Sequence, residues 1–187
     1  MSDNNFWKII DASLSDNQSQ QSKKLAAELS KLSKFDLISF EGSYRTKLAE
    51  TYHWDLWAAA YIINGGCSDD GFDYFCDWLI SRGQTVYEAA LANPETLINI
   101  ATPWDTEFEE FRYIMMEAMD QKQGGEFPAP STSRPTSPAG DEWDEDTVSA
   151  KYPKLAAWVA SNVPTSPPPP TAPTPKPSFW QRLFGKS

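Results

Sequence analysis

Residues 47–83 read KLAETYHWDLWAAAYIINGGCSDDGFDYFCDWLISRG, and this stretch decides the fold class. Its first half has polar side chains only near the start and is apolar nearly all round afterwards, which is typical of a central, buried helix. The Asn-Gly-Gly run at 64–66 is a strong helix-ending signal. Ser68 is a natural N-cap for a second helix, which Gly83 closes. The stretch therefore predicts an antiparallel helical hairpin.

The sequence on either side of the hairpin predicts further helices. Before it, apolar residues recur at helical spacing behind polar N-caps, and Gly42 is the expected weak point of one segment. After it, Thr85 and Glu88 form a capping box, and Thr102–Pro103 is expected to start a long helix. No segment alternates polar and apolar residues convincingly, as a strand would. We expect an all-α fold, a single irregular bundle of about six to seven helices.

Proline-rich stretches organise the rest of the chain. Residues 126–140 have the composition of a linker, but residues 141–163 are too apolar to leave in water, so we expect one domain, 1–163, with an internal Pro-rich loop. Residues 164–177 read as a stiff, polyproline-like linker. The last segment, 178–187, is a short amphipathic motif, expected to be disordered until a partner groove or the chain's own acidic body receives it. Its apolar stripe consists of Phe179, Trp180, Leu183 and Phe184.

The charge balance limits the partners. Three of the 16 Lys and Arg residues lie after Val163 whereas all 26 acids lie before it, so residues 1–163 carry a formal charge of −13. Such a body repels nucleic acid and anionic lipid, and a basic protein is its most natural charged partner. The N-terminus lacks a basic export signal and no apolar run is long enough to span a membrane. We expect a cytoplasmic protein with two reduced cysteines, no stable membrane association and no cofactor.

The second helix of the hairpin carries four aspartates within about 100° of one another on a helical wheel, beside an apolar face. They are Asp69, Asp70, Asp73 and Asp77. The first two are favourable first-turn charges, whereas Asp77 lies too far from the helix start to benefit and needs another partner. A metal-dependent hydrolase would use the first three with a carboxylate from another helix, such as Glu107. We assign no metal site on this pattern alone.

One further arrangement would allow catalysis. A hairpin that turns at 65–66 places residue i beside about 131 − i, so His53 is expected near Asp77 and Cys76. Such a contact would serve acid–base or nucleophilic chemistry. The more ordinary interpretation is a hydrogen-bonded histidine and a small core cysteine. In the same way, Trp57 and Tyr61 either line a binding groove or, as aromatic stripes usually do, belong to the core.

Three motifs carry a resemblance to a known family. They are Phe6–Trp7 with Ile10, the run from Leu56 to Gly83, and Trp143 with Tyr152-Pro-Lys-Leu. The chain resembles an uncharacterised bacterial family, a domain of unknown function, over residues 4–160. The resemblance implies that the Pro-rich loop lies inside the domain, and it implies no activity, ligand or catalytic residue. The family is expected to carry arginine where this chain has Cys76 and Gln84.

Two functions remain open on the sequence. The acidic body and the lack of a complete catalytic set favour an interaction or regulatory module that binds a basic protein. Its candidate binding residues are Trp57, Tyr61, Asp69, Asp70, Asp73 and the apolar stripe of the tail. The alternative is the carboxylate-based hydrolase. No G-x-G-x-x-G, Walker A or Cys-x-x-Cys motif occurs, which argues against nucleotide-binding folds and structural zinc.

Overall fold

A computed structural model describes residues 1–122, 124–129 and 132–164. The all-α prediction is confirmed, since these residues form nine α-helices, one 3-10 helix and no strand beyond an isolated bridge. The helices outnumber the six to seven expected, in part because the closing segment forms two. Their bounds are α1 Asp3–Ser13, α2 Gln18–Ser30, α3 Lys34–Thr51, α4 Trp54–Asn64, α5 Asp69–Ser81, α6 Gln84–Ala92, η1 Pro94–Asn99, α7 Glu110–Asp120, α8 Val148–Lys151 and α9 Pro153–Asn162.

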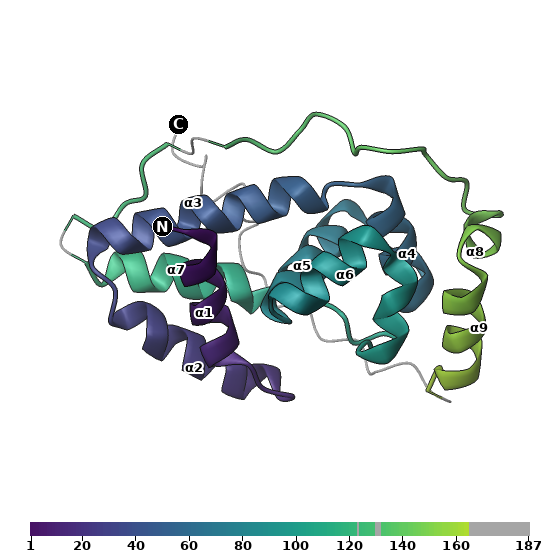
Figure 1. Cartoon of the computed structure of the whole chain (residues 1–187), viewed down its shortest axis with the longest axis horizontal. Coiled ribbons are helices and arrows are strands. Elements are labelled where there is room, and N and C mark those ends of the chain that lie inside the picture. The colour runs from purple at the N-terminus through teal and green to yellow at the C-terminus, as the bar shows by residue number, and fades with distance from the viewer. Residues whose placement is uncertain (123, 130–131, 165–187) are drawn as a thin grey trace.

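The helices form one elongated body around α3, which runs along its long axis (Figure 1). Helices α1, α2 and α7 gather at one end, and α4, α6, α8 and α9 lie at the other. Helix α5 contacts α3, α4, α6 and α7, so it joins the two ends. A single apolar cluster runs through the whole, from Phe6 in α1 to Leu155 in α9. The predicted hairpin helices α4 and α5 supply many of its buried side chains.

Helix α3 corrects the predicted break at Gly42. The helix continues through Gly42, whose surroundings are open, and ends at Thr51. The chain breaks instead at Tyr52 and His53, because residues far along the sequence compete for the backbone there. Ala139 of the Pro-rich loop accepts from the backbone N–H of Trp54 at 2.8 Å and donates to the carbonyl of Tyr52 at 3.0 Å. This long-range pairing leaves no local signal in the sequence.

Two predicted helix starts also differ. Helix α6 begins at Gln84 without a side-chain cap, so the Thr85–Glu88 capping box does not form. Helix α7 begins at Glu110, because residues 102–109 pack as an irregular loop between α4 and α5 instead of continuing a helix. The loop is held by its backbone, since the N–H of Phe108 donates to the carbonyl of Tyr74 at 3.0 Å. Buried side chains in this loop outweigh the helix-start signal.

The segment after the Pro-rich loop packs on α4. Trp143 donates its indole N–H to the carbonyl of Trp54 at 2.9 Å, and Leu155 of α9 is fully buried. Of the expected linker 164–177 and motif 178–187, all but Pro164 lie outside the described residues. Within the part of the chain that is described, no helix has the length and apolarity needed to cross a lipid bilayer.

Substitution of Gly83 by alanine should destabilise the fold, and the same substitution at Gly42 serves as the control. Its φ is +89°, and a Cβ there would lie 2.7 Å from the Asp11 carboxylate, so Gly83→Ala combines backbone strain with a clash. We expect it to lower the free energy of unfolding by about 1–3 kcal/mol. Gly42→Ala, in the open interior of α3, should instead raise it by about 0.5–1 kcal/mol.

Urea denaturation of both variants checks these values. A Gly83→Ala protein as stable as the wild type would show that the junction between α5 and α6 is not built as described.

Candidate functional site: the carboxylates of helix α5

Helix α5 begins as the sequence predicts. The hydroxyl of Ser68 accepts from the N–H of Gly71 at 3.2 Å, which makes Ser68 the N-cap. Asp69 and Asp70 follow in the first turn and are exposed. Their negative charges lie at the positive end of the helix dipole, and this attraction stabilises the helix start.

Asp77 lies on the same helix but is completely buried. Its carboxylate accepts a hydrogen bond from the Tyr44 hydroxyl of α3 and one from Nε of Arg112 in α7. The Arg112 side chain is itself only 6% exposed. The sequence indicates that Asp77 needs a partner, and the partner is an arginine 35 residues further along the chain. We call Tyr44, Asp77 and Arg112 the buried triad.

Burial and charge act against each other within the buried triad. Burial raises the pKa of the Asp77 carboxyl to about 6, although Arg112 and the Tyr44 hydroxyl both act to lower it. Burial and the neighbouring Asp77 raise the pKa of Tyr44 well above its usual value, so the phenol keeps its proton and donates it to the carboxylate. Burial by itself would lower the pKa of Arg112, but the attraction of Asp77 outweighs it and the guanidinium stays charged. The triad therefore fits a structural role.

Asp73, one turn earlier, is bound by two arginines. Its Oδ2 lies 3.5 Å from Nη1 of Arg112, and its carbonyl accepts from Nη2 of the same residue at 2.9 Å. Its Oδ1 accepts from Nη1 of Arg134 at 2.6 Å. Arg134 belongs to the Pro-rich loop, and its guanidinium also lies over the ring of Tyr52, 3.9 Å from the ring centre. The role of Arg134 could not be predicted from the sequence, because nothing in a Ser-Pro-rich segment marks one residue as a long-range contact.

His53 does not have the partners that the hairpin register predicts. It is the N-cap of α4, where Nδ1 accepts from the N–H of Asp55 at 3.2 Å, and its ring packs against Gly140 of the Pro-rich loop. Throughout the described ranges, no hydrogen bond or ion pair joins it to Cys76 or Asp77. The register rule fails because α4 begins only at Trp54. His53 therefore lies beyond the helix to which the rule applies.

Neither cysteine has the electrostatic surroundings of a nucleophile. Burial raises the pKa of Cys76 strongly, and this residue is 3% exposed. Burial, followed by the charges of Glu107 and Asp69, raises the pKa of Cys67 to about 12. A thiol is nucleophilic as the thiolate, so both are predominantly unreactive near neutral pH.

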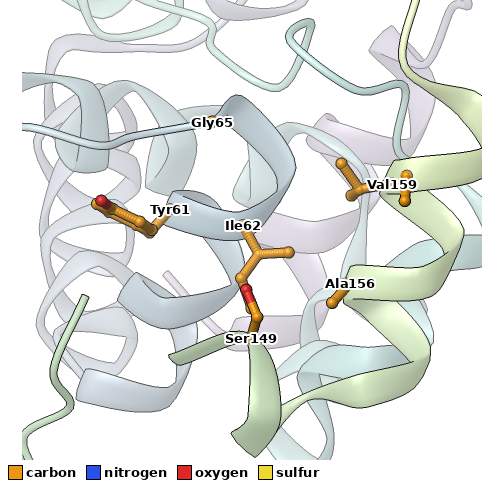
Figure 2. Close-up of a pocket in the computed structure, with 7 residues that line it drawn as sticks. Tyr61, Ile62, Gly65, Ser149, Ala156 and Val159 are labelled. Carbon is orange, nitrogen blue, oxygen red and sulfur yellow. The ribbon is translucent and has the colours of Figure 1, made fainter. Parts of the chain in front are cut away.

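The two aromatic candidates have different surroundings. Trp57 stacks on Phe72 with ring centres 4.8 Å apart, and its indole N–H donates to the carbonyl of Cys67. It is therefore part of the packing. Tyr61 lines a shallow hollow of about 310 Å³ between α4 and the pair α8 and α9, together with Ile62, Ala156 and Val159 (Figure 2). The hollow is largely apolar, and none of the α5 aspartates lines it.

The described residues do not provide the ligands of a metal site. In the described part of the chain, no group of three or more His, Cys, Asp and Glu side chains is arranged to hold an ion. Asp73 already receives two guanidinium groups, which a cation would have to displace. Asp69, Asp70 and Glu107 are instead exposed, and the charges of Asp69 and Glu107 act on the nearby Cys67. We call these three carboxylates the acidic rim.

Comparison with known proteins identifies a family but no function. Residues 1–121 match the sequence profile of a family described as "Protein of unknown function (DUF4240)". The matched range contains α5 and the buried triad, whereas the Pro-rich loop, α8 and α9 lie outside it. No curated protein and no solved structure matches the chain significantly.

Removal of one member of the buried triad should lower the free energy of unfolding strongly. Arg112→Met leaves the Asp77 carboxylate buried without its cation, and we expect it to lower the free energy of unfolding by about 3–5 kcal/mol at neutral pH. Arg112→Met with Asp77→Leu removes both charges, so the double variant should be more stable than Arg112→Met alone. Urea denaturation measures both. Costs that simply add in the double variant would contradict the pairing.

The same variant has a predicted pH dependence. The pKa of Asp77 is about 6 in the folded protein and 3.8 in the unfolded protein. Such a carboxyl contributes its full stabilisation below pH 3.8, and this contribution is lost as the pH rises through the folded pKa. Arg112→Met raises the folded pKa of Asp77 further because it removes a charge that lowers it. Between about pH 5 and pH 8 the variant should therefore lose more stability with rising pH than the wild type.

Proposed function

We propose that this chain, which belongs to the DUF4240 family of proteins of unknown function, is a cytoplasmic interaction module that binds a basic protein through the acidic rim. The main support is the way α5 divides its carboxylates. Asp77 and Asp73 are neutralised by arginines of this chain. Within the described residues, Asp69, Asp70 and Glu107 are exposed and have no ion-pair partner, so their charge is not neutralised there.

Long-range charge supports the same function. Residues 1–163 carry a formal charge of −13, which repels polyanions and attracts basic proteins over distances up to roughly the Debye length, about 8–10 Å in physiological salt. Exposed carboxylates keep their hydration, so they contribute mainly to the rate and selectivity of encounter. We therefore expect binding that weakens steeply with salt.

Charge-matched variants test the acidic rim. Asp69→Asn, Asp70→Asn and Glu107→Gln together remove three negative charges from the rim. Asp141→Asn, Glu142→Gln and Asp146→Asn remove three from an exposed segment elsewhere. In pull-downs from a bacterial lysate, we expect the wild type and the second variant to recover a partner at low salt but not at high salt. The rim variant should lose most of that partner at low salt.

Circular dichroism controls for folding, because the rim variant also removes two first-turn charges worth about 0.3–1 kcal/mol each. Equal recovery by the two variants, or no salt-sensitive partner at all, would refute the proposal.

The C-terminal motif is a second proposed contact. Phe179, Trp180, Leu183 and Phe184 have the spacing of one apolar stripe on a helix, which suits a hydrophobic groove on a partner. We predict that deleting residues 164–187 leaves the thermal midpoint unchanged within error and weakens partner recovery. A deletion that unfolds the domain would show that these residues belong to its core.

A further inference from the structure

We infer that Asp73 and Tyr52 form a binding site for an arginine side chain, which Arg134 occupies in this structure and which an arginine of the basic partner takes over. We call this pair the arginine clamp. The inference rests on the proposed function, because it specifies what the basic partner must carry.

The clamp holds the guanidinium of Arg134 by two contacts, a hydrogen bond to the carboxylate of Asp73 and a cation–ring contact with Tyr52. Asp73 accepts from Nη1 of Arg134 at 2.6 Å, while Cζ of the guanidinium lies over the Tyr52 ring, 3.9 Å from the ring centre. A guanidinium can donate in its plane and stack through its face at the same time, whereas a lysine ammonium is a compact charge without a plane. The clamp should therefore prefer arginine to lysine.

Both halves of the clamp are positioned by residues other than Arg134. Asp73 is held on α5 with Oδ2 beside Arg112, which is buried in the triad. The Tyr52 ring packs against Trp57 and Phe72, with ring centres 6.4 Å away in each case. Removing Arg134 should thus leave a formed, vacated site, and a preorganised site needs little ordering of its own when it binds a ligand.

Arg134 can leave the clamp without opening the core. Its side chain is 32% exposed, and Ser133, Pro135 and Thr136 beside it are exposed as well. The next anchor of the loop is the backbone pairing of Ala139 with Tyr52 and Trp54, five residues further on. A partner arginine therefore competes with a surface side chain.

The clamp is continuous with the acidic rim. Asp73 lies one helical turn after Asp69 and Asp70, so a basic segment attracted by the rim passes the clamp. Asp73 and Tyr52 lie within the range matched to the family, and Arg134 lies outside it. The site and its present occupant thus come from different parts of the chain.

The test uses the full chain with Arg134→Ala and a blocked tetrapeptide of residues 133–136, Ser-Arg-Pro-Thr. Amide shifts in NMR titrations up to about 10 mM report binding near Tyr52 and Asp73. We expect Arg134→Ala to bind the peptide at least about 10-fold more tightly than the wild type, because a side chain tethered in place competes at an effective concentration in the millimolar range. The same peptide with lysine in place of arginine should bind Arg134→Ala at least about 5-fold more weakly.

Two further variants make the result decisive. Adding Asp73→Asn to Arg134→Ala should abolish the preference for arginine. Arg45→Ala, which removes an arginine from its pair with Glu41, should behave as the wild type. No binding to Arg134→Ala, equal binding of the two peptides, or insensitivity to Asp73→Asn overturns the inference. The tetrapeptide assay is independent of the rim variants, so the clamp and the proposed function can fail separately.

Discussion

The structure depends on one buried charge. Asp77 has no exposed surface, and a carboxylate in such a place is tolerated only when a cation and hydrogen-bond donors surround it. Tyr44 comes from α3 and Arg112 from α7, so these two helices must meet α5 at this point. The pair need not add net stability, but arrangements of the three helices that separate its members would strand a charge in the core.

The constraint at Asp77 also determines what the rest of α5 can do. The helix cannot turn about its axis without exposing Phe72 and Phe75 and burying its outer carboxylates. Asp73 is left at the boundary, where it is 17% exposed and reachable by arginines from two directions. Asp69 and Asp70, in the first turn, are exposed to solvent. A helix that looks like a uniform acidic arc thus has one internal, one boundary and two external carboxylates.

Local patterns predicted the fold class well and the site only in part. Periodicity, the Asn-Gly-Gly ending and the Ser68 cap are local signals, and they placed α4 and α5 correctly at their shared turn. The need for a partner at Asp77 was also visible, because its position on the helix gives it no dipole support. The identity of that partner was not, since Arg112 approaches from another helix. The Pro-rich loop, through Ala139 and Arg134, shaped the chain near Tyr52 in ways that only tertiary packing determines.

The side chain of Arg112 offers the most direct test of the buried triad. Hydrogen exchange of its Nε–H, followed by NMR at increasing urea, reports how the bond to Asp77 opens. The structure predicts exchange only on global unfolding, with the same urea dependence as the backbone amides of Phe75 and Leu79 in α5. Exchange that is fast and independent of urea would mean that the bond opens locally, and would contradict the central place given to this interaction.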